Sequence, residues 1–521
     1  MRQAIRYAQT LRHLRPVQII NRVQRRLFPA RPDLGTAPAR RNPRALFAAP
    51  CRRAARVQGD RFSVLNIERD IAAAAAWNDR SPSHLWLYNL HYFDDVPGGP
   101  ADPHAPVFDA FVERWIRENP AGQGTGWDPY PISLRLVNWI KWALTGGVLT
   151  PAALHSLAVQ ARYLAASLEY HLLANHLWAN GKALLFAGLF FEGAEADDWC
   201  TRGAAILKAQ SREQFLGDGG HFELSPMYHA ILTEDLLDII NLQAAYAMEA
   251  VPLKPVAAAA LRWLGVMTRG DGRFPLFNDA TYGVAQDHAA LAAYAARLGI
   301  GAPQADDGTT WLPDTGYLRV SNARYQLFAD AGPVGPSYNP GHGHCDMLSF
   351  EFFAGVPVIV NTGISTYAPD ALRLAERRTA AHNTVQVGDA EQSDLWGAFR
   401  VARRAHIVER QTGEACFSAA HDGFRGQGVL HRRTFETGPD GITIRDDCGT
   451  ATATARLHLH PDITPRQDGD MVHAGPVTLA FEGAAQVSLR PGHYAPEFNR
   501  RIPNMVVEAH FPGRLTTRLT L

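Results

Sequence analysis

The spacing of apolar residues changes once along the chain. From about residue 61 to residue 298 they recur every three to four positions, as on the buried face of an amphipathic helix. The clearest stretch, residues 154–168, follows Thr150 and Pro151, an N-cap and first-turn proline that together mark a helix start. Similar stretches occupy residues 132–144, 182–191, 204–215, 232–248, 255–268 and 287–298. This part of the chain is therefore predicted to be an array of helical hairpins.

From about residue 311 onward, apolar and polar residues alternate, which is the pattern of half-buried strands. The predicted strands are residues 317–320, 325–329, 348–353, 356–360, 384–387, 441–445, 455–460, 477–481, 487–490, 506–511 and 515–521. Residues 438–441 and 467–470 carry the Gly, Pro and Asp that hairpin loops favour. Short strands at this spacing predict a β-sandwich.

The two patterns divide the chain into predicted domains. A segment rich in Pro, Gly and Asp, residues 301–314, separates them. We expect a basic N-terminal extension over residues 1–60, a helical domain over residues 61–305 and a β-sandwich over residues 306–521, which is an α+β multidomain fold. The length of 521 residues agrees, because single cores stop growing near ~250–300 residues.

Charge and cysteine content exclude several classes of function. Lys plus Arg and Asp plus Glu both number 51, so no long-range field of one sign attracts nucleic acid. The five cysteines are scattered without a C-x-x-C motif, which argues against a disulfide framework and against a cysteine zinc ribbon. An anionic ligand must therefore be held by a local cluster of side chains.

The first 32 residues, MRQAIRYAQTLRHLRPVQIINRVQRRLFPARP, predict a short basic helix. Arginines interrupt the apolar run that a secretion signal needs, and no stretch of about 18 consecutive apolar residues predicts a membrane span. We therefore expect a location in the cytoplasm or at the periphery of the inner membrane, with the periplasm as the alternative. A helix lying on a membrane surface is a second interpretation of this segment. The oligomeric state stays open.

Two motifs of the helical half place polar groups where a core would not need them. In EYHLLANHLWANGKALLFAGLFFEG, the side chains of Asn175, His176 and Trp178 cluster at a junction between helices. Because a buried polar group without a partner costs ~1–3 kcal/mol, a position lining a cleft is favoured. In SPMYH, a Ser-Pro pair places Tyr228 and His229 in the first turn of a helix, whose positive end favours a phenolate. A tyrosine packed beneath the helix start is the alternative.

A third motif, GWDPYPISLRLVNWIKW, combines aromatic rings with an arginine. Trp127, Tyr130 and Arg135 are candidates for a carbohydrate groove, in which sugars stack on rings and a guanidinium pairs with a carboxylate. Packing in the core is the alternative for these residues, and it is the interpretation favoured for Trp139 or Trp142.

Three histidines of the β-rich half are candidates for a functional site. His342 and His344 stand two residues apart in GHGHCDMLSF, and His382 enters another predicted strand in RRTAAHNTV. His344 and His382 are candidate ligands of zinc or a similar cation, with Asn361 or Asp346 as a third group. A hydrogen-bonded histidine cluster is the alternative.

These motifs together resemble the heparinase II/III family of polysaccharide lyases. The resemblance rests on NHLWANGKALLFAGLFF, SPMYH, GHGHCDMLSFEFFAGVPVIVNTGISTY and RRTAAHNTV in that order, and covers residues 80–400 and nearly the whole chain. It implies an incomplete (α/α) toroid followed by an antiparallel β-sandwich. It also implies cleavage of a uronic-acid-containing polysaccharide by β-elimination, which leaves 4,5-unsaturated uronate ends, so the expected partner is an acidic polysaccharide such as a bacterial exopolysaccharide.

The resemblance also implies roles for individual residues. Asn175 is expected to neutralise the uronate carboxylate, and Tyr228 and His342 are expected to share the acid and base roles. His344 and His382 correspond to two ligands of a structural zinc site. Asn361 stands where the family has an aspartate, so zinc is expected to bind weakly or not at all. The expected substrate-binding residues are His176, Trp178, His229, Arg135, Trp127 and Tyr130.

Two other functions remain open at this point. A glycoside hydrolase would need two facing carboxylates, for which Glu223, Glu234, Asp235 and Asp279 are candidates. A non-catalytic glycan-binding component of polysaccharide assembly would need no such pair. The products separate these readings, because elimination creates an unsaturated uronate and hydrolysis does not.

Overall fold

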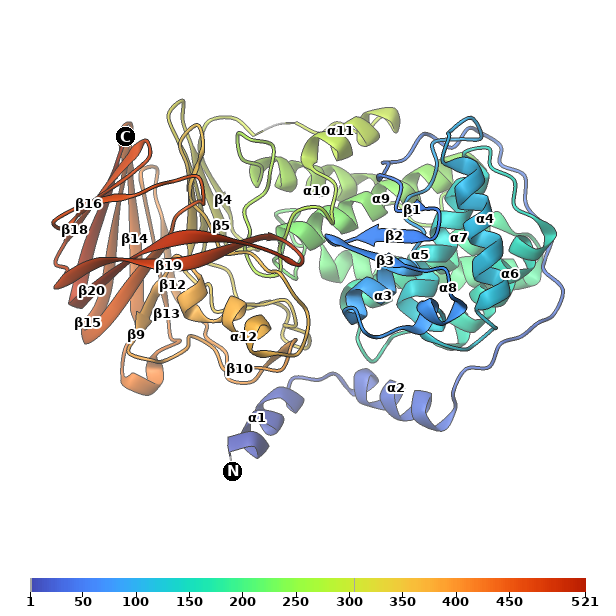
Figure 1. Cartoon of the computed structure of the whole chain (residues 1–521), viewed down its shortest axis with the longest axis horizontal. Helices are drawn as coiled ribbons and strands as arrows, with labels where there is room; N and C mark the ends of the chain where they lie inside the picture. The colour runs from blue at the N-terminus through green and yellow to red at the C-terminus, as the bar shows by residue number, and fades with distance from the viewer. Residues whose placement is uncertain (1, 304) are drawn as a thin grey trace.

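The computed structural model describes residues 2–303 and 305–521. It contains a helical domain and a sheet domain that lie side by side, with the N-terminal segment running along one edge of both (Figure 1). The predicted change from helices to strands is therefore confirmed.

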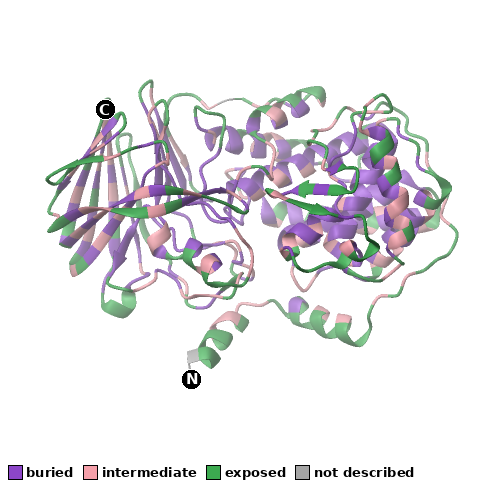
Figure 2. Cartoon of the chain, viewed as in Figure 1, coloured by how far each residue is buried: buried purple, intermediate pink, exposed green. Residues whose placement is uncertain are grey.

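The helical domain is an incomplete (α/α) toroid. Its helices are α3 (His84–Leu90), α4 (Ala105–Glu118), α5 (Pro129–Leu144), α6 (Pro151–Ala166), α7 (Ala174–Phe190), α8 (Ala194–Gln214), α9 (Pro226–Tyr246), α10 (Lys254–Val266) and α11 (His288–Arg297). The helix α7 packs against α5, α6, α8 and α9, and nearly all of its side chains are buried (Figure 2). A helix that is apolar on every side is a central helix, and α7 is the one that begins with the Asn175 motif.

The predicted helix starts are present. The Thr150 hydroxyl accepts a hydrogen bond from the Ala153 N–H at the start of α6. The Ser225 hydroxyl accepts one from the Tyr228 N–H at the start of α9. Each cap satisfies a backbone donor that the first turn leaves free. Tyr228 is thereby fixed in the first turn of α9, as the motif predicted.

The sheet domain is an antiparallel β-sandwich. One sheet has the order β4 (Gly308–Leu312), β5 (Tyr317–Ser321), β6 (Gln326–Asp330), β7 (Phe350–Phe353), β8 (Pro357–Ile359). The larger sheet has the order β12 (Ile407–Thr412), β13 (Cys416–His421), β14 (His431–Gly438), β15 (Gly441–His458), β20 (Arg500–Thr520), β18 (Val477–Glu482), β17 (Met471–Ala474), β16 (Arg466–Asp468). In addition, β19 (Gln486–Glu497) pairs with β20, and β9 (Val385–Val387) pairs with β15. Apolar side chains from both sheets form one core.

Two sequence predictions for this domain need correction. The separate strands predicted at 441–445 and 455–460 are the two ends of β15, which continues through a register shift between Asp447 and Thr452. The strands predicted at 506–511 and 515–521 likewise belong to β20. A bulge breaks the apolar alternation without ending the strand, so the sequence pattern divides what the backbone joins. The strands β12, β13 and β14 were not predicted.

The N-terminal segment contains more structure than the single basic helix expected. It forms α1 (Arg2–Leu11) and α2 (Pro16–Leu27), and then a three-stranded sheet of β1 (Val57–Gln58), β2 (Arg61–Val64) and β3 (Ile67–Asp70). The helical domain therefore begins after residue 70, not at residue 61. Across the described residues, the helices are all too short or too polar to cross a membrane.

The two domains share an apolar contact. Trp263 and Phe277 of the helical half pack with Tyr317 and Phe328 of the sandwich in one buried cluster. The segment that follows Phe277 continues along the sandwich, and the backbone N–H of Asp279 donates to the carbonyl oxygen of His342 (3.1 Å). This packing fixes the sandwich loop between β6 and β7 against the start of α9.

Candidate active site

Tyr228 and His342 face each other at the junction of the two domains. Tyr228 lies in the first turn of α9, and His342 lies in the loop between β6 and β7. The ring centroids are 4.0 Å apart with an interplanar angle of 33°. Both rings are partly exposed, and 15% of the His342 side chain reaches solvent. The juxtaposition expected from the motifs is therefore present.

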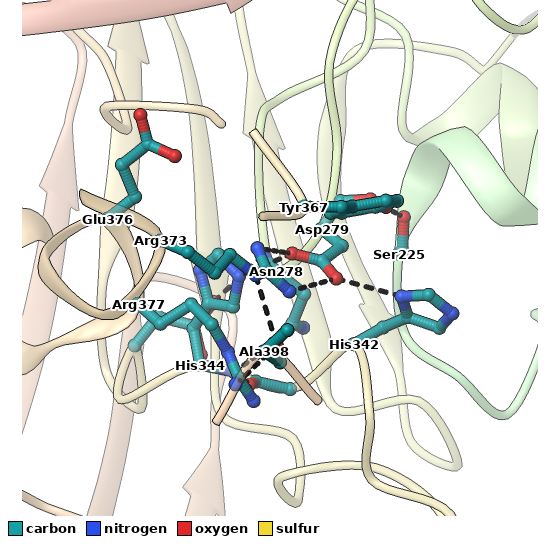
Figure 3. A network of polar contacts seen from close by, with 12 residues as sticks. Ser225, Asn278, Asp279, His342, His344, Tyr367, Arg373, Glu376, Arg377 and Ala398 are labelled. Atoms are coloured by element: carbon teal, nitrogen blue, oxygen red, sulfur yellow. Dashed lines mark hydrogen bonds and ion pairs between the residues drawn. The ribbon is translucent and has the colours of Figure 1, made fainter. Parts of the chain in front are cut away.

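A buried carboxylate orients His342 (Figure 3). The Nδ1 atom of His342 lies 2.8 Å from Oδ2 of Asp279, whose side chain is completely buried. Because an ionised carboxylate only accepts hydrogen bonds, Nδ1 carries the proton and Nε2 presents a lone pair. Nε2 lies 3.8 Å from Oε2 of Glu223. The imidazole is thus held in one tautomer with its accepting nitrogen directed toward the helical domain.

Asp279 is itself held by a buried arginine. Arg373, in α12 (Ala371–Arg377), donates from both terminal nitrogens to the two carboxylate oxygens of Asp279, in the bidentate geometry that favours this pair. Burial alone would raise the pKa of Asp279, but the Arg373 guanidinium and the two histidines hold that pKa well below its usual range. Asp279 is therefore ionised, and its negative charge lies next to Nδ1 of His342.

The two histidines of the GHGH motif share this carboxylate. His344 Nε2 lies 2.8 Å from Oδ1 of Asp279, while His342 takes Oδ2. The two rings nevertheless face different neighbours, because His342 lies against Tyr228 and His344 lies against His382. Between them, a Cβ at Gly343 would lie 2.0 Å from the carbonyl oxygen of Val334, so only glycine fits.

Tyr228 is held as a neutral phenol. Its hydroxyl lies 3.2 Å from the hydroxyl of Tyr367. Burial, followed by the neighbouring Tyr367, raises the pKa of Tyr228 well above its usual range. The expectation that the helix end favours a phenolate is therefore corrected, because desolvation of the anion outweighs the partial charge of one helix end.

Asn175 lies in the same cluster. Its side-chain Nδ2 donates to Oε2 of Glu223 at 3.2 Å, and its backbone N–H donates to Oε1 at 3.3 Å. Burial raises the pKa of Glu223, which makes the neutral acid more accessible. Asn175, Glu223 and His342 thus meet at one point between α7, the segment before α9 and the sandwich loop.

Unusual backbone conformations flank these polar groups. Leu224, directly after Glu223, has φ of 58°, and Asn278, directly before Asp279, has φ of 54°. The Asn278 side chain donates to the carbonyl oxygen of Leu224 at 3.0 Å and ties the two segments together. Left-handed conformations of non-glycine residues cost of order 1–3 kcal/mol each, so the surrounding packing must hold these carboxyl groups in place.

His176 and Tyr130 extend the cluster on the helical side. Their ring centroids are 4.5 Å apart, and 31% of the His176 side chain is exposed. Burial lowers the pKa of His176, but the Glu169 carboxylate, 3.1 Å from Nδ1, outweighs burial and leaves that pKa raised. Both rings are partly exposed, and the predicted contact of His176 and Tyr130 with the substrate stays a prediction.

The other four predicted substrate-binding residues do not reach the surface. Trp127, Arg135, Trp178 and His229 are at most 4% exposed, and their polar atoms already have partners inside the helical domain. Arg135, for example, donates to Gln160 and to two backbone carbonyl oxygens. Substrate contact by these residues is therefore wrong. Trp139 and Trp142 are core residues, as predicted.

The candidate metal ligands are close together, and of the two third groups considered, Asp346 and not Asn361 lies with the histidines. His344, Asp346 and His382 each offer a ligand atom within 4.8 Å of the others, and all three are buried. Nδ1 of His344 and Nε2 of His382 have no hydrogen-bond partner among the described residues. Asn361 instead places its Oδ1 3.0 Å from the other nitrogen of His382. Two unpartnered ring nitrogens beside a carboxylate fit a divalent cation, with Asp346 in place of Asn361.

Arg373 and Tyr367 were not found from the sequence, and Asp279 was considered only as a hydrolase acid. The sequence offers one signal for Arg373, which is a second arginine, Arg377, four residues later on the same face of α12. In the structure both guanidinium groups are buried, and that of Arg377 donates to the carbonyl oxygen of Gly343. Contacts between residues 63 to 94 positions apart in the chain leave no local pattern in a single sequence.

Comparison with known proteins agrees with this architecture. A model of the heparinase II/III N-terminus matches residues 104–296, and a model described as heparinase II/III-like, C-terminal, matches residues 305–520. A heparin-sulfate lyase of Pedobacter heparinus is 26% identical over 308 residues, which are 52% of this chain and 46% of that protein. The match thus spans about half the length of that relative.

Solved structures share the fold. A crystal structure of heparinase III superposes with a TM-score of 0.63 and 18% identity, covering 79% of this chain and 73% of the other. The heparan sulfate lyase of Pedobacter heparinus superposes with a TM-score of 0.58 and 17% identity, covering 88% and 81%. Because the two family models together extend over most of both domains, the chain belongs to the heparinase II/III family.

Proposed function

We propose that the protein is a polysaccharide lyase that cleaves a uronic-acid-containing polysaccharide by β-elimination. The observation that carries the proposal is the Tyr228–His342 pair, a neutral phenol against an imidazole of fixed tautomer, with Asn175 beside them. Elimination needs a base for the C5 proton, an acid for the leaving O4 oxygen and groups that offset charge on the carboxylate. These three requirements correspond to the groups present.

In this mechanism His342 is the base. Its Nε2 lone pair accepts the C5 proton, the C5–H electron pair forms the C4–C5 double bond, and the C4–O4 bond breaks. Asp279 stabilises the imidazolium that results, because its negative charge lies 2.8 Å from Nδ1. Tyr228 donates its phenolic proton to the departing O4 oxygen, which suits a phenol whose pKa is raised by burial. Proton transfer from His342 through solvent then restores the phenol.

Asn175 and His176 are proposed to hold the uronate carboxylate. Charge builds up on that carboxylate as the C5 proton leaves, so an amide N–H and an imidazolium both stabilise the transition state more than the ground state. Glu223 fits this arrangement in its protonated form, in which it donates a hydrogen bond instead of repelling the substrate. The raised pKa of Glu223 supports that state.

His344, Asp346 and His382 are proposed to hold a structural divalent cation, zinc being the one that suits two imidazoles and a carboxylate. When bound, the cation would fix the His344 ring, which in turn donates to Asp279. Its contribution would be to position the Asp279 carboxylate behind His342.

Metal binding gives the first prediction. Asn361→Asp is expected to raise zinc affinity about tenfold or more, because a carboxylate accepting from the Nδ1 side of His382 makes Nε2 a stronger ligand. Asp346→Asn is expected to abolish binding. Calorimetric titration of zinc into chelator-treated protein measures both. Equal affinity in the wild type and Asn361→Asp would contradict the prediction.

The reaction itself is tested with a panel of uronate polymers. We expect at least one of heparan-type, hyaluronan, alginate and bacterial exopolysaccharide substrates to yield products that absorb in the near-ultraviolet, since elimination conjugates the new double bond with the carboxylate. The name of the heparin-sulfate lyase relative puts the heparan-type polymer first. New reducing ends without this absorbance would indicate hydrolysis, and binding without cleavage would indicate a non-catalytic role.

The hydrolase alternative is less well supported by the geometry. Three of its four candidate acids are engaged in ion pairs: Asp279 with Arg373, Glu234 with Arg53 and Asp235 with Lys182. Glu223 remains without an arginine or lysine partner among the described residues. A retaining or inverting hydrolase needs two such carboxyl groups facing each other.

A further inference from the structure

The helices α1 and α2 are amphipathic with the usual orientation reversed. They lie outside both domains along one edge of the molecule (Figure 1), and most of their surface is exposed (Figure 2). A surface helix normally turns its apolar face toward the core and its polar face toward water. Here polar side chains contact the protein and the large aliphatic side chains are exposed.

The contacts of α2 show this directly. Asn21 accepts a hydrogen bond from the backbone N–H of His171 at 3.0 Å, and Arg25 donates to the carbonyl oxygen of Ser167 at 2.6 Å. Gln18, one turn earlier on the same face, is 2% exposed. The apolar residues of the helix, in contrast, are 39–64% exposed: Val17, Ile19, Ile20, Val23 and Leu27.

The helix α1 repeats the arrangement against the sandwich domain. Arg6 forms an ion pair with Asp394, and the Thr10 hydroxyl accepts from the indole N–H of Trp396. Ile5 and Leu11, on the opposite side of the helix, are 48% and 52% exposed. Polar anchors therefore fix one helix on each domain, and each helix presents its aliphatic residues to the outside.

The N-terminal segment carries charge of one sign only. Residues 1–32 contain eight arginines and no Asp or Glu, although the whole chain is neutral. Arg22 and Arg26 form no ion pair among the described residues. Their positions on the helix flank the apolar face of α2. Eight arginines on each copy would repel a second copy of the same surface, whereas an anionic lipid surface complements both the charge and the apolar face.

We propose that α1 and α2 bind the protein to an anionic lipid bilayer. The aliphatic residues would enter the boundary between headgroups and acyl chains, and the flanking arginines would pair with lipid phosphates. Because the polar anchors remain on the protein, both domains would be held at the membrane surface without a spanning helix. This binding does not depend on the proposed lyase reaction.

The test is flotation of the full chain with vesicles. We expect binding to vesicles of phosphatidylethanolamine and phosphatidylglycerol and little binding to phosphatidylcholine alone. Replacing Arg22 and Arg26 by Gln should weaken partitioning about 30-fold, since each arginine near an anionic surface contributes about fivefold. Ile20→Ser/Val23→Ser/Leu27→Ser should weaken it at least about tenfold. Because these side chains are exposed, the variants should keep the wild-type circular dichroism spectrum and melting temperature.

The matched control removes three exposed aliphatic residues elsewhere. Val148→Ser/Val356→Ser/Leu430→Ser, whose side chains are 46–78% exposed in other parts of the chain, should bind vesicles as the wild type does. Absence of vesicle binding, or equal binding by the α2 triple variant and the wild type, would overturn the proposal. If light scattering shows that the wild type is a dimer and the α2 triple variant is a monomer, this face instead binds a second copy of the chain.

Discussion

Tyr228→Phe is expected to lower kcat by about 10²–10⁴-fold, because positioned proton transfer contributes that much and phenylalanine has no proton to donate. Among the described residues, the Tyr228 hydroxyl forms a hydrogen bond only with the Tyr367 hydroxyl, at 3.2 Å, so the ring stays in place against His342 when that oxygen is removed. Binding should change less than turnover, since the sugar still meets the same aromatic face. The measurement is steady-state formation of unsaturated product with separate values of kcat and KM.

Tyr246→Phe provides the matched control. The Tyr246 hydroxyl is buried in the helical domain and has no hydrogen-bond partner among the described residues. Its removal should leave both kcat and KM unchanged, which separates loss of the catalytic oxygen from loss of any tyrosine hydroxyl. Wild-type turnover by Tyr228→Phe would reject the acid role of Tyr228 and with it the elimination mechanism proposed above.

The architecture was predictable because it depends on local periodicity. The change from the helical period to the strand period locates both domains, and caps such as Thr150 mark helix starts within a few residues. Long strands were predicted less well. In β15 a bulge interrupts the alternation, so a pattern of period two detects its ends and misses the middle.

The candidate site was predictable only in part. Tyr228, His342 and Asn175 stand in motifs of unusual local composition, so the sequence identifies them. Arg135 stands in an equally unusual motif yet serves the core, where one amide and two carbonyl oxygens satisfy its guanidinium. An arginine among aromatic residues has the same sequence signature in a sugar site and in a buried cluster, and only the packing separates the two.

The network behind His342 could not be predicted, because it joins three distant segments of the chain. Asp279 precedes the sandwich, His342 lies in the β6–β7 loop, and Arg373 lies in α12. Each is an ordinary residue in its local sequence. Their importance arises from mutual burial, since a carboxylate and a guanidinium with no access to water must be paired.

The buried pair of Asp279 and Arg373 is expected to contribute strongly to both stability and turnover. Asp279→Asn should lower the free energy of unfolding by about 3–5 kcal/mol, the usual cost of leaving a buried charge without its partner. The charge left behind is that of Arg373, whose side chain is completely buried. Turnover should also fall sharply, because a neutral amide neither fixes the Nδ1 proton of His342 nor stabilises its imidazolium. Chemical denaturation and product formation measure the two effects separately.

A double variant distinguishes a structural role of Asp279 from a positioning role. Asp279→Asn/Arg373→Met removes both buried charges and keeps an apolar side chain against the Tyr367 and Phe399 rings that Arg373 now covers. Replacement of a buried ion pair by apolar contacts is often neutral for stability, so the double variant should recover most of the unfolding free energy lost by the single one. Turnover should not recover, since His342 still lacks the carboxylate on Nδ1. Recovery of both stability and turnover in the double variant would show that Asp279 acts only through folding. Wild-type stability of the single variant Asp279→Asn would show that the buried Arg373 charge does not need the Asp279 carboxylate.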